Sequence, residues 1–360
     1  MKKVLHLITG LEFGGGAENA LLQIIPELKK TENRICCIKG RGEIAKKLEQ
    51  KGIKIYYLNM KNWLDFSIIF KYKKVIKEYK PDIQVNYLIH ADIFGRVFGK
   101  LFGVKKIVSF NRSRYKKFFH KFIDKITFGL VDFFIANSEV NLSYYRKKNK
   151  IPEEKSFCIP NGVDLKKYSF KLDDEKKLKE LKLSKKDFIL TCVARLSKEK
   201  DHEAMFKALK YLNDKRIKLI LCGEGKEKEK LKKLRKKLGL EDQILILGNR
   251  KDVLEILRVT DVFVLPSLFE GMSNALLEAM ASKKCCLVSD IDENKELIKN
   301  GKNGLTFKVK DCKDLARKIK YLMENKEKRE EFGKNAFKTI KEKYEIHKII
   351  KEYDELLEKV

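Results

Sequence analysis

The chain has 360 residues, 43% of them hydrophobic and 37% charged, which suffices for one large or two ordinary globular domains and excludes intrinsic disorder. Its 81 Lys and Arg outnumber 51 Asp and Glu, and the net charge of +30 favours an anionic partner. Residues 1–165 carry 32 basic and 16 acidic side chains, and residues 166–360 carry 49 and 35. This spread leaves two interpretations open, a field for acidic lipid or phosphate and a solvated Lys-rich surface. We expect no nucleic acid partner.

The cysteines and the apolar runs bear on location. There are eight cysteines and no C-x-x-C pair, so neither a disulfide framework nor a zinc site is expected. Five of them lie in or beside short apolar runs and are predicted to be buried free thiols: Cys36, Cys37, Cys192, Cys222 and Cys285. The longest nearly apolar run, 126–136, is about half a bilayer span and contains Asp132. We therefore expect a cytoplasmic chain without a signal peptide or a transmembrane helix.

Short β-rich apolar runs alternate with segments of helical period along the whole chain. The first series of predicted strands covers 3–8, 34–38, 53–58, 83–88, 105–110 and 133–137. The second series follows a polar stretch at 171–186 and covers 188–194, 218–223, 244–248, 261–266, 285–289 and 304–307. Alternation of strands and helices is typical of βαβ units and parallel sheets.

The two series predict an α/β protein made of two Rossmann-like, doubly wound parallel-sheet domains facing a central cleft. The predicted boundaries are 1–165 for the first domain and 166–345 for the second. The tail has a helical pattern from 330 to 360. Its last part, 346–360, is expected to be a helix that crosses between the domains and packs back toward the first. Such folds bind ligands beyond the carboxyl ends of their strands, so we expect the site in the cleft.

Three motifs follow predicted strands. Gly14, Gly15 and Gly16 stand before a helix that starts near residue 17, where glycine lets the backbone approach a ligand closely, although a merely flexible turn is an alternative. The pattern is not G-x-G-x-x-G, which disfavours a dehydrogenase. Arg195 and Lys200 follow the first strand of the second series, where two positive charges can neutralise a diphosphate leaving group.

The strongest motif is LPSLFEGMSNALLEAMA, which follows the strand at 261–266. Its loop contains Glu270, and its helix is predicted to start near Asn274 and to carry Glu278. Backbone N–H groups of four loop residues are expected to form an anion site at the helix N-terminus: Gly271, Met272, Ser273 and Asn274. A carboxylate one turn into that helix can accept hydrogen bonds from a ribose diol.

In this order the motifs resemble the retaining glycosyltransferases of family 4, which have the GT-B fold. The resemblance covers essentially the whole chain. It rests on GGGAE (14–18), HADIFGR (90–96), VDFFIANSE (131–139), IPNGVD (159–164), ARLSKEKD (194–201), CGEG (222–225) and the E-x7-E pair at 270 and 278.

The resemblance implies transfer of a sugar from a nucleotide diphosphate sugar with retention of configuration, without a cofactor or an obligatory metal. Carried over by position, Arg195 and Lys200 would hold the diphosphate, and Glu278 would hold the ribose. Glu270 and the 271–274 backbone would contact the donor sugar and its phosphates, and Gly15 and Gly16 would border the phosphates. The first domain would bind the acceptor and the second the nucleotide sugar.

The sequence departs from the family pattern at two places. Asn86 and Tyr87 stand where relatives often have a first His, and we favour His90 as the active-site histidine over a plain role at a helix start. Relatives often have a Gly-rich segment before the Glu that matches Glu296, whereas this chain has SDIDENKEL. Asp290 and Asp292 form a nominal D-x-D motif but lack the context of a metal site.

Residues 114–130 form a predicted helix with Tyr115, Phe118, Phe119, Phe122, Ile123 and Ile126 on one face and lysines around it. This stripe fits an interfacial membrane helix and equally fits core packing. Our leading hypothesis is a glycosyltransferase, with a UDP-sugar favoured over a GDP-sugar, acting on a lipid-linked or surface glycan acceptor at an acidic membrane surface, on its inner face. The alternatives are a non-catalytic basic protein that binds membrane or nucleic acid, and a GT-B epimerase or phosphorylase.

Overall fold

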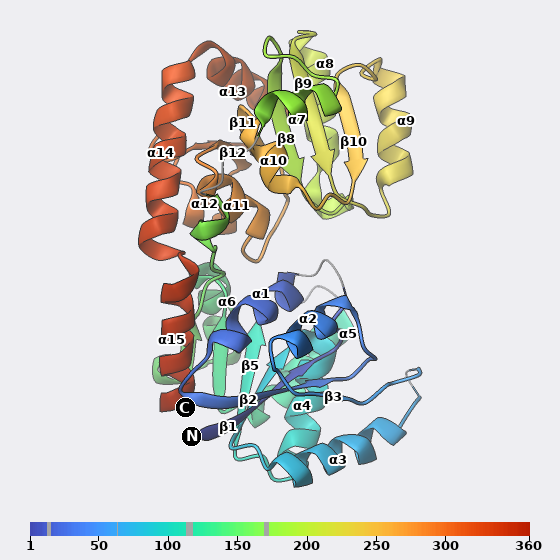
Figure 1. The fold of residues 1–360 in the computed structure, drawn as a ribbon, viewed down its shortest axis with the longest axis vertical. Coiled ribbons are helices and arrows are strands. Elements are labelled where there is room, and N and C mark those ends of the chain that lie inside the picture. The colour runs from blue at the N-terminus through green and yellow to red at the C-terminus, as the bar shows by residue number, and fades with distance from the viewer. Residues whose placement is uncertain (13–15, 63, 113–117, 169–172) are drawn as a thin grey trace. The chain divides into compact units, whose positions relative to one another are not determined.

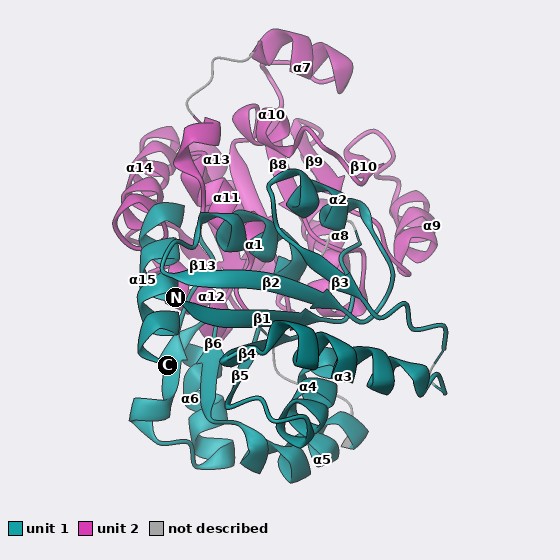
Figure 2. Cartoon of the chain, turned by 60° about the horizontal axis from the view of Figure 1, so that its bottom comes forward, with its two compact units in different colours: residues 1–162, 346–360 teal, residues 163–345 magenta. Residues whose placement is uncertain are grey.

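The computed structural model describes residues 1–360 except 13–15, 63, 113–117 and 169–172. The chain divides into two compact units, which Figure 2 colours separately. Unit 1 comprises Met1–Gly162 and Ile346–Val360, and unit 2 comprises Val163–Glu345. Each unit is a parallel sheet with helices on both faces (Figure 1), so the predicted α/β class with two Rossmann-like sheets is confirmed.

The sheet of unit 1 has seven strands in the order β3-β2-β1-β4-β5-β6-β7. The register of β1 runs from Lys2↔Thr31 to Ile8↔Cys37 on the β2 side and from Val4↔Ile83 to Ile8↔Tyr87 on the β4 side. The strands are β1 (Lys2–Ile8), β2 (Thr31–Cys37), β3 (Ile55–Tyr57), β4 (Ile83–Tyr87), β5 (Lys106–Asn111), β6 (Phe133–Ala136) and β7 (Ser156–Cys158).

Both faces of this sheet are buried, as the alternation along β1 shows. Val4 and Ile8 pack in one apolar cluster with side chains of α1, α2 and α15, whereas Leu5 and Leu7 pack on the opposite face with α3 and α4. The helices of unit 1 are α1 (Gly16–Ile24), α2 (Glu43–Gln50), α3 (Ser67–Tyr79), α4 (Ile89–Leu101), α5 (Phe118–Thr127), α6 (Glu139–Asn149) and α15 (Ile346–Lys359).

The sheet of unit 2 has six strands in the order β10-β9-β8-β11-β12-β13. Along β11, Val262 and Val264 pack with α8, α9 and α13, and Phe263 and Leu265 pack with α11 and α14 on the other face. The strands are β8 (Phe188–Val193), β9 (Ile217–Cys222), β10 (Ile244–Gly248), β11 (Val262–Leu265), β12 (Cys285–Ser289) and β13 (Leu305–Phe307). The helices are α7 (Asp174–Glu180), α8 (His202–Leu212), α9 (Lys228–Leu238), α10 (Val253–Arg258), α11 (Asn274–Ala281), α12 (Asp292–Leu297), α13 (Cys312–Glu324) and α14 (Lys326–Lys343).

All twelve predicted strands are present, with ends that shift by up to three residues, and β7 is an additional strand that the sequence analysis missed. The tail is two helices, because the backbone leaves the helical path at Tyr344. There the Tyr344 carbonyl accepts a hydrogen bond of 2.8 Å from the N–H of Val163, and Val163 forms a β-bridge with Glu345. The five cysteines that the sequence analysis predicts as buried free thiols are buried and form no disulfide bond. Within the residues that the structure describes, no helix is long and apolar enough to cross a membrane.

The predicted helix at 114–130 appears as α5 followed by a 3₁₀ turn, Phe128–Leu130, while Tyr115 lies outside the described residues. Phe119, Phe122 and Ile126 are 66%, 55% and 65% exposed. The core-packing interpretation is therefore wrong for these three side chains.

Candidate active site

The order of the strands creates one switch point in each sheet. At this point two neighbouring strands are followed by connections that run to opposite sides of the sheet. In unit 1 the switch point lies between β1 and β4, and in unit 2 it lies between β8 and β11. Ligands of doubly wound sheets bind beyond the carboxyl ends of the strands at such points. The described residues of the predicted site all follow one of these four strands: Gly16 after β1, His90 after β4, Arg195 and Lys200 after β8, and 270–278 after β11. Gly15 lies outside the described residues.

Two glycines hold the loop of Arg195 against the loop that follows β9. A Cβ atom at Gly225 would lie 2.2 Å from the carbonyl oxygen of Leu196, and Gly223 has a φ of +144°, which side chains rarely adopt. The N–H of Leu196 donates a 3.0 Å hydrogen bond to the carbonyl of Glu224. The CGEG motif thus fixes the backbone beside Arg195. The Arg195 side chain is exposed and makes no ion pair with the described residues.

Lys200 and Glu270 are joined by an ion pair, with 2.5 Å between Nζ and Oε1 and side-chain exposures of 17% and 8%. The same carboxylate oxygen accepts a 2.6 Å hydrogen bond from the Ser267 hydroxyl. The two loops are also joined through their backbones, because the N–H of Leu268 donates to the carbonyl of Glu199 at 2.8 Å. Two residues predicted from separate motifs therefore form one charged pair at the switch point of unit 2.

The loop after this pair leads into α11, whose first residue is Asn274, as the sequence predicts. The Ser273 hydroxyl accepts a 3.3 Å hydrogen bond from the N–H of Leu276, so Ser273 caps the helix. The Met272 side chain belongs to the core of unit 2. Within 271–274 the groups suited to an anion are consequently backbone N–H groups at the positive end of the helix dipole.

Glu278 lies one turn into α11 and is partly buried in the structure. Burial raises the pKa of its carboxyl from 4.5 to about 7, and the charge of Lys167 offsets only part of that effect. The neighbouring Tyr168 has a pKa raised by burial and by the charge of Glu278. Among the described residues Glu278 forms no ion pair, and such a carboxyl group is suited to accept hydrogen bonds from the hydroxyls of a ligand.

In unit 1, His90 is the second residue of α4 and stands two positions after a strained residue. Leu88 precedes the helix with φ 65° and ψ 146°, a conformation that side chains seldom adopt and that costs about 1–3 kcal/mol. The hydroxyl of Thr9, at the end of β1, accepts a 3.3 Å hydrogen bond from the N–H of Ala91. These contacts fix the first turn of α4 against β1 and place His90 at the switch point. Its ring lies 5.4 Å from that of His120, centroid to centroid.

Sequence analysis missed Arg112, which follows β5. Burial lowers the pKa of its guanidinium to about 10, although the nearby carboxylate of Glu18 favours the charged form. The guanidinium donates a hydrogen bond to the side chain of Asn161. Arg112 thus contacts the IPNGVD motif through Asn161, and its charge interacts with that of Glu18 in the GGGAE motif. Neither spacing nor periodicity could have revealed this contact.

Both carboxylates of the nominal D-x-D motif, Asp290 and Asp292, make contacts within the protein. Asp290 accepts a 3.1 Å hydrogen bond from the N–H of Val309, and Asp292 forms a 2.9 Å ion pair with Lys295 in the first turn of α12. Across the part of the chain that the structure describes, no group of three or more His, Cys, Asp or Glu side chains is arranged to hold a metal ion.

Comparison with known proteins decides the family. The model of glycosyl transferases group 1 matches residues 173–339, and the model of glycosyltransferase family 4 matches residues 14–167. A UDP-Gal:α-D-GlcNAc-diphosphoundecaprenol α-1,3-galactosyltransferase from Escherichia coli is 30% identical over 267 residues, which cover 69% of this chain and 67% of that protein. The chain belongs to glycosyltransferase family 4. The prediction of an enzyme that transfers a sugar from a nucleotide sugar is confirmed over that of a non-catalytic basic protein.

Two further proteins resemble this family 4 glycosyltransferase. An N,N'-diacetylbacillosaminyl-diphospho-undecaprenol α-1,3-N-acetylgalactosaminyltransferase from Campylobacter jejuni is 29% identical over 340 residues, with 88% of each chain covered. The structure of HepE from Anabaena in complex with UDP-glucose superposes with a TM-score of 0.89 at 21% identity, and it covers 100% of both chains. The likeness to HepE confirms the predicted GT-B fold.

Proposed function

We propose that this glycosyltransferase transfers a sugar from a UDP-sugar, with retention of configuration, to a saccharide linked through a diphosphate to a lipid. The names of the E. coli and C. jejuni relatives specify diphosphoundecaprenol-linked acceptors, and the name of the E. coli relative specifies a UDP-sugar donor. HepE has been crystallised with UDP and with UDP-glucose. These names support the substrate class of this chain and leave its individual sugars open.

The observation that carries the proposal is the grouping of charged and hydrogen-bonding residues at the switch point of unit 2. We assign the ribose to Glu278, because its carboxyl group forms no ion pair within the described part of the chain and is free to accept hydrogen bonds from hydroxyls. The diphosphate is assigned to Arg195, which supplies a permanent positive charge, and to the N–H groups at the start of α11, which form the positive end of the helix dipole. The donor sugar is assigned to the loop of Glu270.

In this assignment Lys200 orients Glu270 as well as supplying positive charge for the diphosphate. Its ammonium group already holds Glu270 at 2.5 Å, so it both fixes that carboxylate and supplies positive charge beside it. When the bond between sugar and diphosphate breaks, negative charge grows on the leaving oxygen, and preorganised positive groups stabilise that charge. Arg195 and Lys200 therefore promote departure of the nucleoside diphosphate, and we propose that no metal ion is required.

Unit 1 is assigned the acceptor, with His90 at its switch point as the active-site histidine. We propose that the enzyme works at the inner face of the cell membrane, because a diphosphate-linked lipid acceptor resides in a membrane and because α5 exposes Phe119, Phe122 and Ile126.

A thermal shift panel tests the donor assignment. Ligands that bind only the folded protein stabilise it by about 2.7 kcal/mol at a hundred times their dissociation constant. UDP and UDP-sugars are expected to raise the melting temperature more than GDP, ADP or dTDP and their sugars do. Arg195→Ala is expected to reduce the UDP shift, whereas Arg216→Ala, which removes an exposed arginine outside the loop, should leave it unchanged. A preference for another nucleotide, or no shift with any nucleotide, would overturn the donor assignment.

A further inference from the structure

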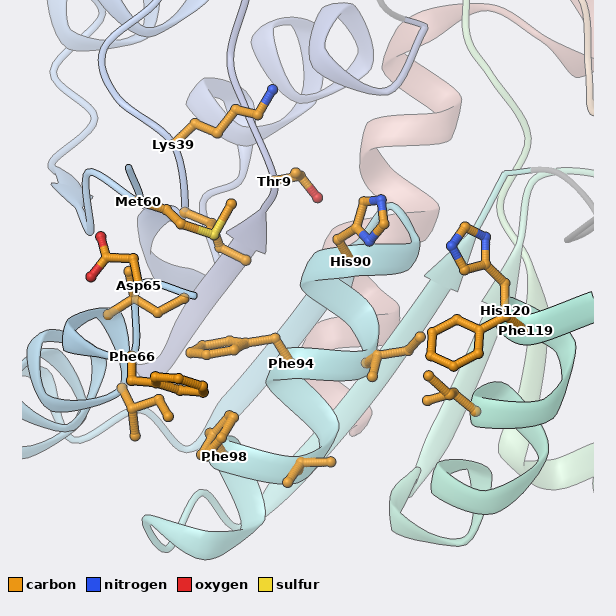
Figure 3. A pocket seen from close by; sticks show the side chains of 16 residues that line it. Thr9, Lys39, Met60, Asp65, Phe66, His90, Phe94, Phe98, Phe119 and His120 are labelled. Atoms are coloured by element: carbon orange, nitrogen blue, oxygen red, sulfur yellow. The ribbon is translucent and has the colours of Figure 1, made fainter. Parts of the chain in front are cut away.

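Unit 1 contains a pocket of about 650 Å³ that runs along α4 (Figure 3). This volume lies within the range of roughly 300–1,000 Å³ that is usual for ligand sites. Its floor is one continuous face of α4, which consists of His90, Ile93, Phe94, Val97 and Phe98. Side chains from the start of α3 and from α5 form the two sides, among them Phe66 and Phe119.

The polarity of the pocket changes along its length. His90, Thr9 and Lys39 lie together at one end, beside the carboxyl ends of β1 and β2, whereas Phe94 and then Phe98 lie progressively farther along α4 (Figure 3). Lys39 is exposed and makes no ion pair with the described residues. The acidic lining residue, Asp65, is occupied by its own loop, because it accepts hydrogen bonds from Lys61 and Ser67. The pocket therefore has a positively charged end and an apolar body.

The side formed by α5 is held in place by a buried charge cluster. Arg96 of α4 contacts Asp92 at 2.6 Å and Asp124 of α5 at 2.9 Å, with all three side chains fully buried. Lys148 of α6 adds a 2.8 Å ion pair with Asp124. Losing one partner of a buried ion pair is strongly destabilising, so this cluster fixes the orientation of α5. It turns Asp124 inward, whereas Phe119, Phe122 and Ile126 of the same helix stay exposed.

Exposed apolar side chains surround the apolar part of the pocket. Phe66 is 66% exposed and Val97 is 36% exposed, and both line the pocket, as does the exposed Phe119. Further exposed apolar side chains lie on the same three helices: Phe70, Leu101, Phe122 and Ile126. Exposed apolar surface of this extent marks an interaction site. These side chains offer an apolar chain in the pocket further apolar contacts along the same helices.

We propose that this pocket binds the isoprenoid chain of the acceptor, with the first isoprene units along Phe94 and Phe98 and the diphosphate beside Lys39 and His90. This inference rests on the proposed function, because it takes the acceptor to be a diphosphate-linked lipid. The occupant follows from the polarity of the pocket: an anionic group is attracted to Lys39, and the linear apolar chain attached to it fits the face of α4. The diphosphate then places the acceptor sugar at the switch point of unit 1.

Two acceptors with the same sugar diphosphate test the proposal, one attached to an isoprenoid of several units and one to a short, water-soluble alkyl group. For the unaltered enzyme in detergent, the KM for the isoprenoid acceptor is expected to be lower by about tenfold or more, because each buried methylene adds to affinity. Val97→Asp places a carboxylate in the apolar part of the pocket and should abolish this difference, with kcat for the short acceptor unchanged. Tyr211→Asp changes a side chain that is 59% exposed on α8 of unit 2, outside the pocket and its surroundings, and should preserve it.

Photo-crosslinking of the unaltered protein gives a second, activity-independent measurement. An isoprenoid diphosphate with a diazirine near the end of its chain is expected to label peptides from α3, α4 or α5. Equal KM values for the two acceptors, or labelling confined to other parts of the chain, would overturn the isoprenoid site alone. Absence of transfer to either acceptor would overturn the proposed function, while crosslinking to α4 would still support the lipid site.

Discussion

Replacing Glu278 by Gln should increase stability and weaken donor binding at the same time. The pKa of Glu278 is raised from 4.5 to about 7, which corresponds to about 3 kcal/mol at 1.36 kcal/mol per pH unit. Since the folded protein binds this proton more tightly than the unfolded chain does, the stability that the group contributes is lost as the pH rises from 4.5 to 7 and stays lost above 7. Glu278→Gln removes the ionisable group and with it this loss.

Urea unfolding at several pH values, without nucleotide, measures the first effect. The variant should exceed the unaltered protein in free energy of unfolding by up to about 3 kcal/mol at pH 8, and the difference should shrink as the pH falls toward 4.5. Calorimetry at pH 8 measures the second effect, a loss of UDP affinity of about 1.5–3 kcal/mol, because the ribose hydroxyls lose a charged acceptor.

The matched control is Glu229→Gln, which changes an exposed glutamate on α9 of the same unit and should alter neither quantity. Lower stability of Glu278→Gln at pH 8 would refute the burial argument. Unchanged UDP affinity would refute the assignment of Glu278 to the ribose.

Three further predictions follow from the site and the cores. Arg195→Ala should lower kcat more than donor affinity, because charge on the leaving diphosphate grows in the transition state; equal losses in rate and binding measurements would indicate ground-state binding only. Burial lowers the pKa of His6 to about 4, so the free energy of unfolding should fall as the pH drops from 6.5 to 4, and His6→Gln should reduce that slope in urea titrations. Flotation with anionic vesicles should show binding that weakens with salt, and a Phe119→Ser, Phe122→Ser variant should lose the salt-resistant remainder; a variant that floats like the unaltered protein would contradict an apolar contribution of α5.

The sequence predicted the sheets well because their strands are buried on both faces and appear as continuous apolar runs. The strand β7 escaped because it begins with Ser156, whose hydroxyl donates to the backbone carbonyl of Pro152, and so lacks the longer apolar run that revealed the other three-residue strands, β3 and β13. The site residues that follow the switch-point strands could be predicted from motifs. Each motif comes directly after a predicted strand, and parallel strands bring such loops to one edge of the sheet.

Pairings between distant residues were not predictable from spacing. Lys200 and Glu270 are separated by 70 positions, and only the adjacency of β8 and β11 brings them together. The apolar stripe of α5 left its orientation undecided, because periodicity locates a stripe but does not show whether it faces the core or the solvent. Its orientation depends on Arg96, which draws Asp124 inward.

Product analysis tests the central claim most directly. The purified enzyme is incubated in EDTA with a UDP-sugar that stabilises it and with a saccharide diphosphate lipid, and the product is examined by mass spectrometry and by NMR of the new linkage. The account predicts that the lipid gains the mass of one sugar and that the linkage retains the anomeric configuration of the donor. An inverted linkage, release of the free sugar alone, or activity that EDTA abolishes and Mg²⁺ or Mn²⁺ restores would contradict it.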